Sequence, residues 1–178
     1  EGSSDGCHNS DYSDICWLLT TTNGTKYYFG RNELPDWKST STTPDTNSVW
    51  TVPVFSNTSG GPCQKSTFKT SVCTEAWQWN LDYVVDAHGN AEAFYYDTES
   101  NKYYEDASTY VSYIRGGQLD HIDYGILAGA SHTAANPYTA GAATDRVTFT
   151  YDKYGRCSVT GTSRSTACTA ESLTGTPA

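Results

Sequence analysis

The six cysteines are the residues whose spacing most clearly indicates chemistry. They fall in three local pairs, with eight to ten residues between the members of each pair. No Cys-x-x-Cys spacing occurs, so disulfide bonds in an oxidising compartment are favoured over a zinc site. We therefore predict a secreted, extracellular protein with disulfide bonds and no metal site. The simplest pairing, with other connectivities left open, is Cys7 with Cys16, Cys63 with Cys73, and Cys157 with Cys168.

The histidines give little indication of catalysis. His88 lies in an expected turn, where a solvated side chain is the ordinary interpretation. Asp120-His121-Ile122-Asp123 holds acid–base groups, but side chains alternate along a strand, so that only His121 and Asp123 would act together. The adjacent Ser131-His132 pair is also disfavoured, because sequence neighbours seldom meet as a catalytic pair. We expect no catalytic residue among them.

Acidic residues offer a hydrolytic alternative. Glycoside hydrolysis needs two carboxylates at a suitable separation, and Asp82, Asp86, Glu92 and Asp97 lie on one expected hairpin. A secreted carboxylate-dependent glycoside hydrolase is therefore one alternative. With 20 acidic residues, chance pairs are common, and a solvated polar face is the preferred interpretation. No acidic cluster has the spacing of an EF-hand, so we predict no calcium site and no cofactor.

Tryptophans offer a binding alternative. Trp37 lies in a polar, proline-containing loop and is the best candidate for an exposed ring that stacks on a ligand. Trp77 and Trp79 share one face of an expected strand, so we predict that they pack in the core. A small secreted module that binds a carbohydrate or a cell surface is therefore the second alternative.

Composition limits the partners. The chain has 178 residues, a length typical of one domain, and a formal net charge of −9. Nucleic acid is disfavoured because its phosphates would be repelled, and no apolar run is long enough to insert into a membrane. The chain begins with Glu1 and contains no Met, so we expect a mature form or a fragment.

Alternating apolar residues and turn signals predict an all-β protein. Asn23-Gly24 separates strands over 15–22 and 25–30, and a turn over 86–90 separates a strand over 77–86 from one over 91–97. Gly116-Gly117 predicts a third hairpin, between strands over 110–115 and 118–124.

Other segments complete the expected fold. Ser100-Asn101 predicts a turn, Pro53 places a strand over 48–55 at an edge or at a bulge, and 146–152 alternates again. Successive antiparallel hairpins would form a twisted meander or an open spiral sheet, with long disulfide-closed loops. We expect a single β-rich domain over 1–170 and a flexible tail over 171–178.

Several segments resemble those of secreted actinobacterial RHS/YD-repeat proteins. Residues 151–156, Tyr-Asp-Lys-Tyr-Gly-Arg, resemble the Tyr-Asp-x-x-Gly-Arg core of a YD repeat. Residues 86–97 resemble its companion form, and segments 77–86 and 115–125 also resemble the family. The resemblance runs from about Cys16 to about Cys168. The motif residues are Asp86, Gly89, Asn90, Tyr96, Asp97, Tyr151, Asp152, Gly155 and Arg156.

The resemblance implies a sheet of YD-repeat type and a structural function. In this family the sheet spirals into a hollow shell that encloses or carries a toxin domain, or mediates cell-surface contact. A chain of 178 residues is too short to close such a shell, and it lacks the Asp-Pro dipeptide of the family's self-cleavage motif. The resemblance therefore implies a non-catalytic structural module. Its expected partners are the rest of a longer RHS chain, or a cell-surface glycan or protein.

Overall fold

The computed structural model describes residues 7–9, 14–35, 44–106, 109–127 and 143–151, and within these ranges the chain is all-β. Its one helical element there is a 3-10 turn, η2 (Phe68–Thr70). None of the described helical segments is long and apolar enough to span a membrane. The strands are β1 (Trp17–Thr20), β2 (Lys26–Phe29), β3 (Val49–Phe55), β4 (Val72–Trp79), β5 (Leu81–Val85), β6 (Asn90–Asp106), β7 (Thr109–Leu127) and β8 (Asp145–Thr148).

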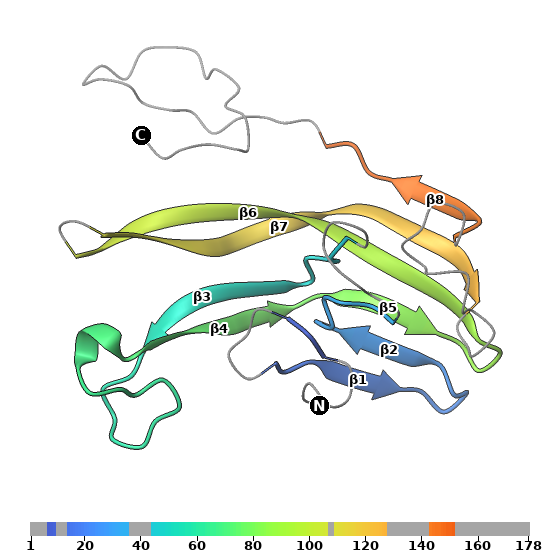
Figure 1. Cartoon of the computed structure of the whole chain (residues 1–178). Coiled ribbons are helices and arrows are strands. Elements are labelled where there is room, and N and C mark those ends of the chain that lie inside the picture. Colours follow the sequence, from blue (N-terminus) through green and yellow to red (C-terminus); the bar gives the residue numbers. More distant parts are fainter. Residues whose placement is uncertain (1–6, 10–13, 36–43, 107–108, 128–142, 152–178) are drawn as a thin grey trace, which may run out of the picture.

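The strands form two antiparallel sheets. Six of them pair in the order β1-β2-β5-β6-β7-β8, and β3 pairs with β4 in a second, two-stranded sheet. From β5 to β8, strands that follow one another in the chain are neighbours in the sheet, as in a meander. Figure 1 shows β6 and β7 running along the molecule as a long twisted ribbon, with β3 and β4 beside it. The predicted all-β, antiparallel fold class is confirmed, and Pro53 lies in a strand of the small sheet, at its edge, as predicted.

Two of the predicted hairpins are confirmed. In the turn between β1 and β2, Gly24 has a φ of 88°, and the Asn23 side-chain oxygen accepts the Thr25 N–H at 3.1 Å. In the turn between β5 and β6, Gly89 has a φ of 86°. There Asp86 Oδ1 accepts the backbone N–H groups of His88 and Asn90, each at 2.8 Å. Both turns therefore depend on a glycine with positive φ and a polar side chain that accepts turn amides.

The predicted third hairpin is wrong. Gly116 and Gly117 lie within β7, which is continuous and pairs with β6 along its whole length. The predicted turn at Ser100-Asn101 is wrong for the same reason, since both residues lie within β6. A Cβ atom at Gly117 would lie 2.5 Å from the Asp97 carbonyl oxygen. The glycine therefore permits a close approach of the neighbouring backbone and does not reverse the chain.

β-Bulges interrupt the pairing at regular places. On β7, the register with β6 skips one residue at each of three positions, five residues apart. Single skips also occur on β6, on β5 and on β4. Each bulge adds a residue to one strand, increases the local twist and redirects a side chain. The skipped residues are Arg115, Asp120 and Gly125 on β7, Glu105 on β6, Asp82 on β5 and Trp77 on β4.

The predicted single strand over 77–86 is wrong. β4 begins at Val72, within the expected loop, and ends at Trp79, while β5 begins at Leu81 and belongs to the other sheet. Asn80 lies between them, and its backbone N–H and side-chain amide both donate to the Ser48 carbonyl oxygen, at 2.8 and 3.0 Å. The chain therefore passes from one sheet to the other at Asn80, and its alternation does not continue across this point.

Tryptophans dock the small sheet onto β7. The Trp50 Cζ2 atom would lie 2.9 Å from a Cβ at Gly117, so the missing side chain makes room for this ring. The Trp77 indole N–H donates to the Ile114 carbonyl oxygen at 2.9 Å, and the Trp50 and Trp77 rings are 5.6 Å apart. The bulge residue Trp77 and the space left at Gly117 together hold the small sheet against β7.

The core lies on one face of the large sheet. It is small, and two of its six buried members are alanines. Tyr28 and Val85 pack against its margin. Its buried members are Leu34, Tyr83, Ala91, Ala93, Tyr95 and Ile126.

Candidate functional site

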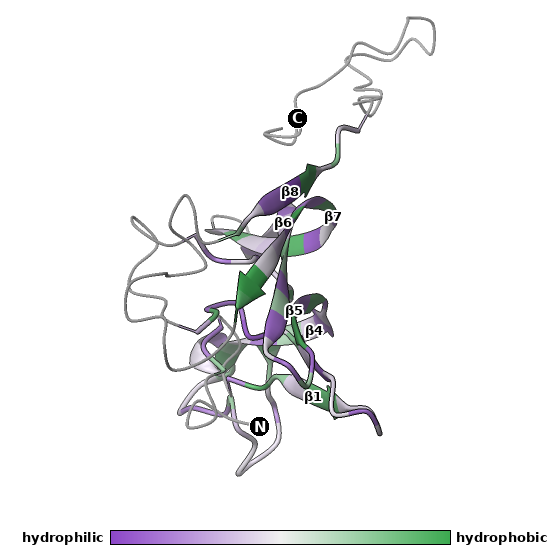
Figure 2. Cartoon of the chain, turned by 90° about the vertical axis from the view of Figure 1, so that its right-hand side faces the viewer, coloured by the Kyte–Doolittle hydropathy of each residue, from purple (hydrophilic) through white to green (hydrophobic). Residues whose placement is uncertain are grey.

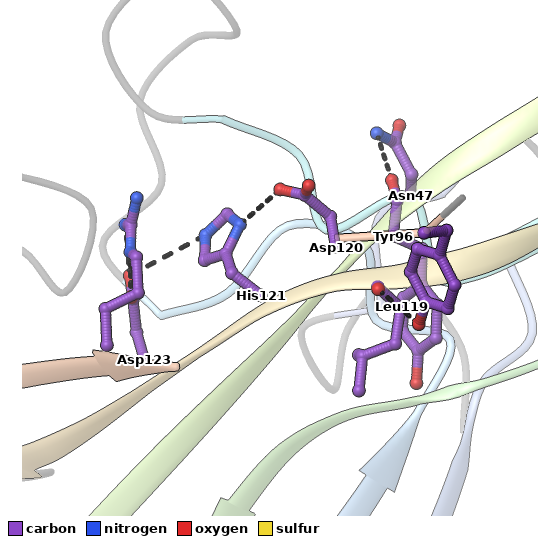
Figure 3. A network of polar contacts seen from close by, with 8 residues as sticks. Asn47, Tyr96, Leu119, Asp120, His121 and Asp123 are labelled. Carbon is purple, nitrogen blue, oxygen red and sulfur yellow. Dashed lines mark hydrogen bonds and ion pairs between the residues drawn. The ribbon is translucent and has the colours of Figure 1, made fainter. Parts of the chain in front are cut away.

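The candidate site lies on β7, where His121 stands between two carboxylates (Figure 3). His121 and Asp123 are two residues apart and share one strand face. The partners of Asp123 in the neighbouring strands are Ala93 on β6 and Arg146 on β8, and the partner of His121 on β6 is Tyr95. The site is therefore built from three adjacent strands on the core side of the sheet.

The contacts around His121 are short and largely buried. Its Nδ1 atom lies 2.5 Å from Asp120 Oδ2, and its Nε2 atom lies 3.9 Å from Asp123 Oδ2. The Tyr95 ring stacks on the imidazole, with centroids 4.4 Å apart and an interplanar angle of 13°. Burial is also the main reason that the pKa of Tyr95 is raised, with the nearby Asp123 charge adding to it.

The expectation that only His121 and Asp123 could act together is wrong. Asp120 is the bulge residue skipped between the Tyr95–His121 and Tyr96–Leu119 pairs. The bulge turns the Asp120 side chain toward His121, which strict alternation would not allow.

Asp123 is held by an arginine on the edge strand. Its side chain is only 6 % exposed, and its two oxygens accept from Arg146 Nε at 2.5 Å and from a terminal guanidinium nitrogen at 2.8 Å. This bidentate contact raises the pKa of Arg146, because the carboxylate favours the charged guanidinium. Sequence analysis missed Arg146, because no local pattern links it to a residue 23 positions away.

The arrangement is better suited to holding strands together than to acid–base chemistry. A general base needs a free nitrogen within reach of a substrate proton. His121 Nδ1 is engaged with Asp120, and Nε2 is buried, with no hydrogen-bond partner among the described residues. Asp123 is committed to Arg146. The cluster can therefore fix β8 against β7 through charge-assisted hydrogen bonds.

A second polar site surrounds Asp82, the bulge residue of β5. Asp82 has no exposed surface, and its Oδ2 atom accepts from Ser48 Oγ at 2.7 Å, Asn32 N–H at 2.8 Å and Thr46 Oγ1 at 3.2 Å. Its Oδ1 atom is buried without a partner among the described residues. Burial raises the pKa of Asp82 to about 6, although the hydrogen bonds and Arg31 oppose the shift. The carboxyl group therefore joins Asn32, Thr46 and Ser48 to β5.

The local sequence does not predict this second site. Alternation placed Asp82 on a polar, solvated face, and the bulge turns it inward instead. No signal in the local sequence marks the bulge.

The four carboxylates considered for hydrolysis do not form a catalytic pair that includes Asp82. Asp82 is buried, and the charged group acting on it within the described residues is Arg31, not a second carboxylate. Asp86 accepts turn amides and the Asn90 side chain, which lower its pKa. Glu92 and Asp97 are exposed on β6.

Most of the described YD-motif residues form hydrogen bonds or turn contacts within the fold. Asp86, Gly89 and Asn90 form the β5–β6 turn. The Tyr96 hydroxyl donates to the Leu81 carbonyl oxygen at 2.7 Å, and burial raises the pKa of Tyr96 to about 12. The Tyr151 hydroxyl donates to the Leu119 carbonyl oxygen at 2.8 Å. Asp97 is exposed, and Asp152, Gly155 and Arg156 lie outside the described residues.

Neither of the two tryptophans expected in the core is fully buried. Trp77 is 44 % exposed, and the Trp79 indole N–H donates to the Ile15 carbonyl oxygen at 2.8 Å. Both rings lie near the crossing between the sheets, so the strand face that would have buried them does not continue. His88 is exposed in its turn, as predicted. Trp37 and Ser131-His132 lie outside the described residues.

Two of the three predicted disulfide bonds are present. Cys7 pairs with Cys16 and Cys63 with Cys73, at Cα separations of 5.8 and 5.3 Å. Cys157 and Cys168 lie outside the described residues. Within the described ranges, the one group of metal-ligating side chains close together is Cys63, Cys73 and Glu75, and its two sulfurs are bonded to each other. They offer no thiolate for a metal.

Comparisons with known proteins do not place the chain in a family. No family model, no curated protein and no solved structure matches it.

Proposed function

We propose that the chain is a non-catalytic structural module of a secreted shell protein of the RHS/YD-repeat kind. In this proposal, its sheet is continued by further strands of a longer chain. The observation that carries the proposal is the six-stranded sheet, which among the described residues ends in β1 on one side and in β8 on the other. Disulfide bonds persist in oxidising compartments, which is why the proposal includes secretion.

The β1 edge supports strand pairing. β1 carries no charged residue, and its Trp17 and Leu19 side chains are 58 % and 55 % exposed. Edges that remain unpaired are commonly protected by charges, prolines or bulges, and β1 has none of the first two. An uncharged, apolar edge is therefore suited to accept another strand.

The β8 edge is exposed as well, but it carries the charged residues Asp145 and Arg146 and is therefore less suited to pairing than the β1 edge. All four residues of β8 are exposed, and Val147 is 43 % exposed. Figure 2 shows β1 and β8 at opposite ends of the molecule, each with hydrophobic positions. A sheet that is open at both ends can be extended in both directions, as stacked hairpins require.

The internal polar contacts also support a structural function. His121, Asp123 and Asp82 form contacts that join neighbouring segments of the chain. Such contacts stabilise an extended sheet whose apolar core is small.

Self-association tests this proposal. Open edges that are pairing surfaces should let the chain associate with itself as its concentration rises, as measured by sedimentation velocity. Leu19→Lys should weaken this association by placing a charge on the β1 edge. The matched control is Phe68→Lys, at an exposed apolar residue outside the sheet. A chain that stays monomeric at every concentration, or an equal effect of both variants, would contradict the proposal.

A carbohydrate-binding function is the second candidate, because the Trp17 ring is exposed and packs against the Trp79 ring. Its ring meets Trp79 edge-on, with centroids 6.0 Å apart and planes at 85°. A braced, exposed indole is a suitable surface for stacking on a sugar ring. A glycan array with the wild-type chain and Trp17→Ala tests this function. Binding that is lost in the variant would favour it over the structural module.

A further inference from the structure

Two tyrosines near the end of the β6–β7 ribbon form an exposed cross-strand pair. Tyr104 on β6 is paired directly with Tyr110 on β7. Their ring centroids are 3.8 Å apart, closer than in any other aromatic pair of the described residues. Each residue is 56 % exposed. Figure 1 shows that this part of the ribbon projects at one end of the molecule.

The strand pairing keeps the two rings together. Directly opposite residues of antiparallel strands remain neighbours as long as the ladder is formed. The side chains are also hydrogen-bonded, and this contact raises the pKa of the Tyr104 hydroxyl. The pair is therefore held in place while both phenols stay open to solvent.

Within the described ranges, no other pair of tyrosines combines this closeness with this exposure. Tyr103 and Tyr113 are diagonal neighbours on the ribbon, but their centroids are 6.0 Å apart and both side chains are half-buried. Tyr95 is stacked on His121 and is only 4 % exposed. Of the tyrosine pairs in the described part of the chain, Tyr104–Tyr110 is therefore the one most open to a reagent in solution.

We propose that Tyr104 and Tyr110 form a site of oxidative cross-linking, where an external haem peroxidase with hydrogen peroxide joins their rings as dityrosine. Each phenol loses one electron and one proton and becomes a phenoxyl radical. The radicals couple by a carbon–carbon bond between ring carbons ortho to the hydroxyls. The two ring hydrogens at these carbons then move to the oxygens through solvent and restore the phenols. One hydrogen peroxide takes up the two electrons and two protons and is reduced to two waters.

The cross-link would close the ribbon covalently. It would join β6 to β7 near their connection, much as the Cys63–Cys73 bond links the start of β4 to the loop before it. Unlike a disulfide, a carbon–carbon bond is not reversed by thiols. The inference does not depend on the shell function, because it needs only the ribbon and an extracellular oxidant.

Peptide mapping after peroxidase treatment tests the inference. The full chain, with its disulfides intact, is treated at low protein concentration with a haem peroxidase and limiting hydrogen peroxide. Trypsin releases residues 103–115 as one peptide, between Lys102 and Arg115. We expect this peptide to lose two hydrogen atoms and to acquire dityrosine fluorescence. Further cleavage after Glu105 should leave its two halves joined.

Single variants identify the residues. Tyr104→Phe and Tyr110→Phe should each reduce the cross-linked peptide to background, while circular dichroism confirms that they fold. Tyr113→Phe is the matched control and should keep the wild-type yield. An unchanged yield in Tyr104→Phe, a cross-link at other tyrosines, or covalent dimers as the main product would each overturn the inference.

Discussion

At the scale of single residues, the buried Asp82 carboxyl group makes stability depend on pH. Its pKa of about 6 lies above that of the unfolded chain, where an aspartic acid titrates near ~4. The folded state therefore binds this proton more tightly than the unfolded state does. The stabilisation is complete below about pH 4 and is lost as the pH rises through about 6, by about 3 kcal/mol in total.

The Asp82→Asn variant tests this pH dependence. Its amide resembles the protonated carboxyl group, because one oxygen can still accept from Ser48, Asn32 and Thr46. We expect the variant to exceed the wild type in stability by up to ~3 kcal/mol at neutral pH and to match it near pH ~4. Urea unfolding at both pH values measures the difference. The exposed Asp97→Asn is the control, and the prediction fails if Asp82→Asn keeps the wild-type pH dependence.

The Asp123–Arg146 contact predicts how β8 is held. Arg146→Ala leaves the buried Asp123 carboxylate without its two guanidinium hydrogen bonds, so we expect a loss of about 2 kcal/mol in unfolding free energy. Hydrogen exchange should accelerate in β8 and in the paired part of β7. Arg146→Lys keeps the charge without the bidentate geometry and should give an intermediate effect. Unchanged exchange in the alanine variant would show that the ladder alone holds β8.

At the scale of the strands, Gly116 and Gly117 distinguish a turn from a bulged strand. A Cβ at Gly116 meets no atom within 4 Å, whereas one at Gly117 meets the Asp97 carbonyl oxygen and Trp50. Gly116→Ala should change the unfolding free energy by less than about 1 kcal/mol, and Gly117→Ala should lower it by about 1–3 kcal/mol. Urea unfolding of both variants measures the contrast. A two-residue hairpin turn would make both alanines costly, so equal losses would contradict a continuous β7.

The Gly116-Gly117 dipeptide also shows which turns can be predicted from the sequence. The turns at Asn23-Gly24 and Asp86–Asn90 were predictable because their residues act within the turn itself. A Gly-Gly dipeptide gives the same local signal for a hairpin and for a close approach between strands. Only the partner strand decides between them, and its register is not written in the local sequence.

Bulges account for what was missed at the candidate site. Asp120 and Asp82 depart from the alternation predicted for their strands, because each is an extra residue in its strand. A bulge is a property of a strand pair, so it leaves no signal in one strand alone. The local cysteine pairs, by contrast, were predictable because each closes a short loop.

At the scale of the whole molecule, the two sheets are joined at several independent points. The Tyr96 backbone N–H donates to the Thr46 carbonyl oxygen at 2.9 Å, just before β3 begins. Trp77 bonds to the Ile114 carbonyl oxygen, and Ser48 and Thr46 both donate to Asp82. These contacts couple the small sheet to the large one, so the described residues should unfold as one cooperative unit.

Removing the Cys63–Cys73 disulfide tests this coupling, because the bond constrains only the small sheet and its loop. The double variant Cys63→Ser/Cys73→Ser should lose about 3 kcal/mol, the value for a loop of this length. Far-UV circular dichroism reports on all strands, and tryptophan fluorescence reports on rings that include Trp50 and Trp77. If the sheets are coupled, both signals shift to lower urea concentration together. Fluorescence that changes first, with circular dichroism unmoved, would show that β3 and β4 unfold separately, and Cys7→Ser/Cys16→Ser provides the comparison for a bond outside the small sheet.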